Sequence, residues 1–172
     1  LSLPASVIPN SNLNLAPLDG TNDRAQTYNM FLSCTNLTKV SNFYLTNLVS
    51  ASRTFQGCVN LTALENCHMT IKNGAGSTTN QMFSGCSNLT EIIIPNNVTS
   101  IGSSAFSGCS GLTNVVIGDS VTSIGYSAFS RCSSLTEITI PNSVTSIGTS
   151  AFLGCQSLTE ITIPNGVTTI GE

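Results

Sequence analysis

Cysteine and histidine are the residues of this chain with the greatest capacity for chemistry. The 172 residues include seven cysteines and one histidine, His68, which directly follows Cys67. A Cys–His nucleophile pair needs both side chains on one side, whereas adjacent residues of a strand point to opposite faces. A metal site needs further ligands at suitable spacing. We therefore expect no catalytic residue, no metal and no cofactor, and we predict that the protein is not an enzyme.

The other cysteines belong to the motif F-x-x-C-x-x-L. Its copies begin 24, 28, 23, 23 and 23 residues apart, at Phe31, Phe55, Phe83, Phe106, Phe129 and Phe152. A fixed period in the range of roughly 20–50 residues is typical of a solenoid, in which each repeat forms one coil. The motif cysteines are Cys34, Cys58, Cys86, Cys109, Cys132 and Cys155.

These cysteines have two interpretations: a disulfide ladder, as in many secreted proteins, or a column of buried thiols packed as small apolar side chains. Parallel coils in register hold equivalent Cβ atoms about 4.8 Å apart, which is longer than a disulfide normally allows. The sequence therefore favours free thiols, and the pairing of Cys67 stays open.

Each repeat changes its apolar spacing part-way through. Ala105, Phe106, Cys109 and Leu112 suit one or two turns of α or 3₁₀ helix with a single buried stripe. The segment 137–140 of the next unit alternates and is rich in β-branched residues, which predicts a short strand.

In that strand, Ile138 and Ile140 should point inward, with Glu137 and Thr139 outward. Pro141 and Asn142 then stop the strand and turn the chain. Val144 and Ile147 return to the core as a second extended edge, and Gly148 permits the corner that follows.

A unit of this length cannot bury its apolar positions alone, but stacked copies can. We predict an α/β repeat solenoid of about 23-residue coils, with a parallel sheet on one face and short helical or 3₁₀ turns on another. Residues 1–172 form one solenoid: 1–82 are degenerate coils with a loop insertion near 73–78, and 83–172 are regular repeats. Because Leu1 and Glu172 both fall inside a repeat, we expect a fragment of a longer array.

Composition narrows the function classes. Charged residues make up 8% of the chain, against roughly 25% in an average domain, and the net charge is −3. A surface built from Ser, Thr and Asn is common in secreted or surface-displayed proteins. The absence of a basic run argues against nucleic-acid binding, and no stretch approaches the ~20 apolar residues of a membrane span. The start at Leu1 shows no signal peptide, which is either missing or already removed.

Four Asn-x-Ser/Thr sequons occur, at Asn36, Asn60, Asn88 and Asn97. Three of them follow the repeat's own C-x-N-L-T pattern. They are either glycosylation sites in a eukaryotic host or ordinary turn residues that face solvent.

The string L-x-x-I-x-I-P-x-x-V-x-x-I-G-x-x-A-F-x-x-C-x-x-L, carried by 112–135 and 135–158 with Gly118–Asp119 replacing Pro in the first, resembles the BspA-like class of leucine-rich repeats. The resemblance is specific over 83–172, partial over 31–82 and weak over 1–30. It implies a curved leucine-rich-repeat solenoid, secretion or cell-surface display, and adhesion. Members occur in anaerobic and host-associated bacteria and in some parasitic protists. Similar proteins bind other cells or matrix components such as fibronectin and fibrinogen, and the family has no catalytic residues to carry over.

The outward strand positions are the candidate ligand face. One predicted column contains Glu65, Glu91, Asn114, Glu137 and Glu160, and the next contains Ile93, Val116, Thr139 and Thr162. Exposed apolar residues in a strand hint at contact with a partner, although the glutamates alone would also serve solubility in a chain with few charges.

Two functions fit these observations. The first is a non-enzymatic extracellular or cell-surface module that binds matrix proteins, other cells or glycans through the solenoid face. The alternative is a structural protein that self-assembles end to end through open coils into filaments or a surface layer, because solenoids without polar caps can stack.

Overall fold

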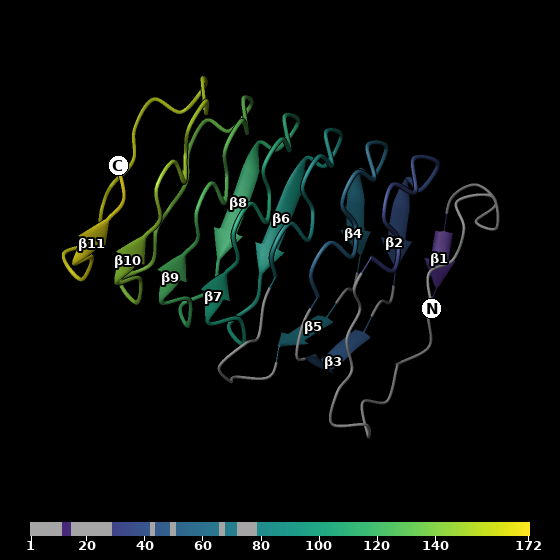
Figure 1. Cartoon of the computed structure of the whole chain (residues 1–172), viewed down its shortest axis with the longest axis horizontal. Coiled ribbons are helices and arrows are strands. Elements are labelled where there is room, and N and C mark those ends of the chain that lie inside the picture. The colour runs from purple at the N-terminus through teal and green to yellow at the C-terminus, as the bar shows by residue number, and fades with distance from the viewer. Residues whose placement is uncertain (1–11, 15–28, 42–43, 49–50, 66–67, 72–78) are drawn as a thin grey trace.

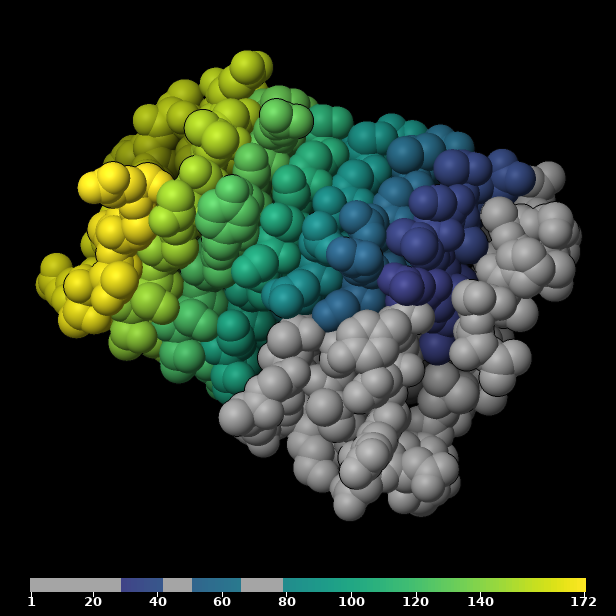
Figure 2. All heavy atoms as spheres, viewed as in Figure 1, coloured from purple at the N-terminus to yellow at the C-terminus, as the bar shows by residue number. Residues whose placement is uncertain are grey.

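The computed structural model describes residues 12–14, 29–41, 44–48, 51–65, 68–71 and 79–172. Cys67 and the insertion expected near 73–78 lie outside the described residues. Parallel coils about 23 residues apart stack side by side along the molecule (Figure 1) and appear as adjoining bands of colour on its surface (Figure 2). The predicted solenoid and its parallel strands are therefore confirmed.

Two rows of parallel strands run along the stack (Figure 1). The first row contains β1 (Asn12–Asn14), β2 (Lys39–Ser41) and β4 (Ala63–Glu65), followed by the pair β6 (Glu91–Ile94) and β8 (Asn114–Ile117). The second row is one sheet of β7 (Ser100–Ile101), β9 (Ser123–Ile124), β10 (Ser146–Ile147) and β11 (Thr169–Ile170). The earlier coils instead carry a separate parallel pair, β3 (Tyr44–Leu48) and β5 (His68–Ile71).

The motif F-x-x-C-x-x-L forms consecutive turns, and no helix is present in the described part of the chain. The N–H of Cys132 donates to the carbonyl of Phe129 at 3.2 Å, as a turn requires. The N–H of Phe129, however, donates to the carbonyl of Ala151 in the next coil at 2.8 Å. Positive φ angles at Ser127 and Arg131 break any helical run. The expected helical turns are thus corrected: bonding between coils takes the donors that a helix would use within one coil.

The phenylalanines of the motif form a continuous stack through the core. Successive ring centroids lie 5.2–5.6 Å apart and neighbouring planes differ by 3–15°, from Phe31 through Phe55, Phe83, Phe106 and Phe129 to Phe152. Such aromatic pairs contribute roughly 0.5–1.5 kcal/mol each beyond the area they bury. The leucines of the motif are fully buried as far as Leu135.

The predicted alternation of 137–140 is confirmed, because Ile138 and Ile140 are buried while Glu137 and Thr139 are exposed. Strand pairing is weaker than expected there, however. A single bridge joins Thr139 to Thr162, in place of the four-residue ladder that joins β6 to β8.

Gly148 is required for a different reason from the one the sequence suggests. Its φ is not in the left-handed region, so the corner itself does not demand glycine. A Cβ at this position would lie 2.6 Å from the backbone nitrogen of Tyr126 and 2.7 Å from the carbonyl carbon of Gly125. Glycine is present because the backbones of neighbouring coils approach closely.

Candidate functional site

The outward side of β6 and β8 presents four of the candidate face residues in two cross-strand pairs. Glu91 lies opposite Asn114, and Ile93 lies opposite Val116. All four side chains are exposed, including 68% of Ile93 and 48% of Val116. Two large aliphatic side chains therefore lie side by side in water, although the inward residues of the same strands are buried.

The other four candidate residues continue this face over the next two coils. Thr139 and Thr162 are joined by a bridge, and Glu137 and Glu160 precede each of them by two residues. All four are exposed. The structure thus gathers all eight predicted residues on the outward side of four consecutive coils.

The column that the sequence predicted for Glu65 is wrong. In the parallel register of β2 and β4, Lys39 lies opposite Ala63 and Ser41 lies opposite Glu65. Counted from the motif leucine, Glu65 is equivalent to Ile93, and Ala63 is the residue equivalent to Glu91. The Glu65 carboxylate also forms an ion pair with the Lys39 ammonium at 2.5 Å.

Two shallow hollows lie on this face where strand pairing is weakest. One, of about 400 Å³, is lined by Glu137, Thr139, Glu160 and Thr162, among others. The second, of about 450 Å³, adjoins it and extends to Asp119 and Pro164. Asp119 is a residue of this face that was not predicted from the sequence. The replacement of the usual Pro by Gly118–Asp119 is the feature of the sequence that could have indicated it.

All charged groups of the face are acidic. Over 79–172 they are Glu91, Asp119, Glu137 and Glu160, and the one Lys or Arg residue in that range, Arg131, lies outside the face in the turn between Phe129 and Cys132. The described Lys and Arg residues of the earlier coils each bond to a nearby side chain. Lys39 pairs with Glu65, and the Arg53 Nε donates to the Gln81 Oε1 at 2.8 Å.

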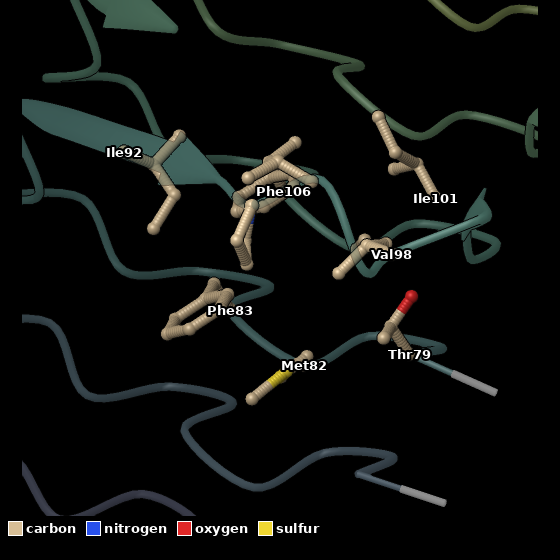
Figure 3. Close-up of a pocket in the computed structure, with 10 residues that line it drawn as sticks. Thr79, Met82, Phe83, Ile92, Val98, Ile101 and Phe106 are labelled. Carbon is tan, nitrogen blue, oxygen red and sulfur yellow. The ribbon is translucent and has the colours of Figure 1, made fainter. Parts of the chain in front are cut away.

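A small apolar cavity lies among core residues of the coils 79–106 but offers no site. Met82, Phe83, Phe106 and Val98 point toward it (Figure 3), and its volume is about 30 Å³. The single lining hydroxyl, on Thr79, already accepts a hydrogen bond from the N–H of Gly102 at 2.8 Å. A space this small and apolar favours neither a ligand nor an ordered water, which needs two to four polar partners.

The motif cysteines form the predicted column of free thiols. Each thiol from Cys58 onward donates to the carbonyl of the phenylalanine one coil earlier, at 3.0–3.2 Å. Burial raises the pKa of Cys58 and of Cys132 to about 12, and it also raises the pKa of Cys109. A thiol held neutral in this way is a poor nucleophile and a poor metal ligand. Within the described part of the chain, no cluster of three or more His, Cys, Asp or Glu residues could hold a metal ion.

Two of the sequon asparagines bond between coils through the nitrogen that a glycan would occupy. The Asn60 Nδ2 donates to the carbonyl of Thr35 at 2.7 Å, and the Asn88 Nδ2 donates to the Asn60 Oδ1 at 3.2 Å. Asn36 is exposed and Asn97 is half-buried.

Comparison with protein families decides what kind of solenoid this is. The family model described as BspA type leucine-rich repeat region (6 copies) matches residues 76–172, which is more than half of the chain. The chain belongs to the BspA-type leucine-rich repeat family. The match includes all eight residues of the candidate face, and the family suggests a protein-interaction module.

Solved structures of bacterial leucine-rich repeat proteins resemble this BspA-type chain. A leucine-rich cell-surface protein of Faecalibacterium prausnitzii A2-165 is 31% identical, with a TM-score of 0.60 over 78% of this chain. Leucine-rich repeat proteins of Bacteroides ovatus ATCC 8483 and Eubacterium ventriosum ATCC 27560 are each 24% identical and have TM-scores of 0.67 and 0.68 over 94% and 97% of this chain. At that identity the last two comparisons show the fold alone.

The BspA-type chain spans only part of these proteins: 35% of the Faecalibacterium chain and 48% of each of the other two. A search of curated proteins found no significant match. Among the described residues, no helix has the length and apolar character needed to cross a bilayer.

Proposed function

We propose that this chain is a non-enzymatic adhesion module, secreted or displayed at a cell surface, which binds a protein partner through the outward face of β6, β8 and the next two coils. The observation that carries the proposal is the exposed pair Ile93 and Val116, held side by side in a regular strand ladder. Exposed aliphatic neighbours of this kind are more typical of contact surfaces than of open solvent.

Three further observations support the proposal. The face extends over four coils, so many weak contacts can add up without any one deep pocket. The Faecalibacterium relative is itself a cell-surface protein. The thiols of the motif cysteines, which are the most reactive side chains described, are packed in the core. The exposed residues of the face are better suited to binding than to covalent chemistry.

The test is a variant that adds positive charges to the face. The triple variant Ile93→Lys, Val116→Lys, Thr139→Lys should remove binding to immobilised fibronectin or fibrinogen, measured by surface plasmon resonance, because it replaces the apolar pair with three hydrated cations. The far-ultraviolet circular dichroism spectrum should stay unchanged, since all three side chains are exposed.

A matched control separates contact from net charge. Tyr126→Lys, Gln156→Lys, Ser157→Lys also adds three charges at exposed positions, outside the proposed face, and should bind like the parent chain. The proposal fails if the face variant retains binding, or if the control loses binding to the same extent.

A further inference from the structure

We infer that the partner segment is cationic: an extended stretch of protein in which a lysine or arginine is followed two residues later by an aliphatic residue, docking across the acidic face described above. This inference rests on the proposed function and adds the chemistry of the partner. The aliphatic side chains of the segment cover Ile93 and Val116, and its cations face Glu91, Glu137, Glu160 and Asp119.

The charge of the face favours a cationic partner. Across the regular coils the face carries carboxylates and no basic residue, and Arg131 lies in a turn outside it. The other described Lys and Arg residues belong to the earlier coils, where Lys39 pairs with Glu65 and Arg53 donates a hydrogen bond to Gln81. A surface of one sign attracts the opposite sign and repels its own, which sets the choice of partner and the rate of encounter.

The spacing of the face supports a segment in which a cation and an aliphatic residue lie two positions apart. Along β6, Glu91 and Ile93 both point outward two residues apart, and the inward residues Ile92 and Ile94 are buried. A strand laid over this face presents outward groups at the same spacing of about 6.6–6.8 Å per two residues. A cation followed two residues later by an aliphatic side chain therefore meets Glu91 and Ile93 in turn.

The two hollows give the cations of the segment a place to lie. Glu137 and Glu160 line the first, and Asp119 lines the second, with the hydroxyls of Thr139 and Thr162 shared by both. Openings of about 400 and 450 Å³ accommodate a lysine or arginine side chain without closing around it.

The same surface argues against a glycan. Sugar rings commonly stack on aromatic side chains, yet over 79–172 the exposed aromatic residue is Tyr126, which lies in the turn after β9 and outside the face. A sulfated glycan would in addition meet the repulsion of the carboxylates. Protein is therefore the occupant that the observations favour.

The test uses three synthetic octapeptides as probes: two copies of Lys-Ser-Val-Ser (the Lys–Val peptide), two copies of Lys-Ser-Ser-Ser (the Lys–Ser peptide) and two copies of Glu-Ser-Val-Ser (the Glu–Val peptide). Fluorescence anisotropy with the whole chain at about 20 mM salt should show binding of the Lys–Val peptide, at least about tenfold weaker binding of the Lys–Ser peptide, and none of the Glu–Val peptide. Raising the salt to about 300 mM should weaken the Lys–Val complex roughly tenfold, because exposed charges are then screened.

Variants of the chain separate the contribution of the carboxylates to Lys–Val binding from that of the aliphatic side chains. Glu137→Gln with Glu160→Gln should weaken the Lys–Val complex and flatten its salt dependence. Gln156→Lys with Ser157→Lys, which changes the net charge equally but away from the face, should change neither. Ile93→Ser with Val116→Ser should reduce the affinity for Lys–Val to that for Lys–Ser.

Equal binding of all three peptides, no binding of Lys–Val, or a salt dependence unchanged by the double glutamine variant would overturn this inference. Tighter binding of heparin than of Lys–Val would overturn it in favour of a glycan. The proposed function is tested separately: if fibronectin binding is lost in the triple lysine variant but the Lys–Val peptide does not bind, the face is an interaction surface and only the cationic partner is wrong.

Discussion

The coils of 31–82 and those of 83–172 share one interior and differ in what surrounds it. Both contain the phenylalanine stack with the same ring spacing, and both bury the thiol that follows each ring as far as Cys132. After the first row of strands they diverge, because the early coils continue into β3 and β5 whereas the later ones fold into the short strands β7, β9, β10 and β11. The two regions therefore share the stacked motif F-x-x-C-x-x-L, and they differ in the second half of each repeat.

The outward residues also differ between the early and the later coils. In the early coils the positions equivalent to Ile93 are Ser41 and Glu65, and the glutamate is closed into an ion pair with Lys39. In the later coils these positions are Ile93, Val116, Thr139 and Thr162. The interior is therefore repeated for stability, while the exposed positions differ where a partner is proposed to bind.

The largest expected effect tests whether the interior is common to both regions. Phe55→Ala and Phe129→Ala should each lower the free energy of unfolding by about 3–5 kcal/mol, since both rings are fully buried between two stacked neighbours. Urea denaturation followed by circular dichroism measures both. A loss below ~1 kcal/mol at Phe55 beside a full loss at Phe129 would mean that the early coils do not share the interior.

The second largest expected effect is a loss of stability at Gly148, in the regular coils. Gly148→Ala should lower the free energy of unfolding by roughly 1–3 kcal/mol, because the new Cβ meets the backbone of the preceding coil at 2.6 Å. Gly166→Ala is the control, since its Cβ would lie 3.1 Å from the nearest atom, the carbonyl oxygen of Asn142, and should lose clearly less in the same denaturation experiment. Equal losses would contradict the close approach at Gly148.

Alkaline pH offers a probe of the thiol column in both regions. Burial raises the pKa of Cys58 and of Cys132 from 9.0 to about 12, so these thiols stay protonated when folded but ionise when unfolded above pH 9. The unfolded state then binds fewer protons, and stability falls as pH rises from about 9 to 12, by up to roughly 1.4 kcal/mol per pH unit for each thiol. Urea titrations at pH 8, 9 and 10 check this. Cys58→Ala should reduce the slope, and an identical slope in the variant would contradict the assignment.

The smallest expected effect is a gain in stability at Arg131. Arg131 has a φ of 61° at the position where Gly57, Gly85, Gly108 and Gly154 have φ between 73° and 77°. Arg131→Gly should raise the free energy of unfolding by about 0.5–1 kcal/mol, because glycine relieves the left-handed strain. Gln156→Gly, at an exposed position without positive φ, should lower it slightly. A loss of stability in Arg131→Gly would show that the arginine side chain contributes more than its backbone strain removes.

The period, the buried columns and the inward and outward positions of 137–140 were predictable, because each depends on spacing along one chain. The turn in place of a helix was not, since the N–H of Phe129 bonds to Ala151 only once the next coil is present. The column of Glu65 was predictable as well, because Glu65 follows the motif leucine Leu61 by four residues, as Ile93 follows Leu89, and the observed register agrees with that count. The hollows near Asp119 depend on how two coils separate, which no single repeat encodes.

We propose that the outward face contacts the partner, and that the repeated interior and the turns do not. This can be tested by labelling the isoleucine, leucine and valine methyl groups of the chain and recording their NMR spectrum while unlabelled fibronectin is added. We expect the signals of Ile93 and Val116 to broaden or shift first, whereas those of the buried Ile101 and Val144 should change least. Changes concentrated at Leu32 and Leu153, the exposed leucines of the turns, or no change at any methyl group, would contradict it.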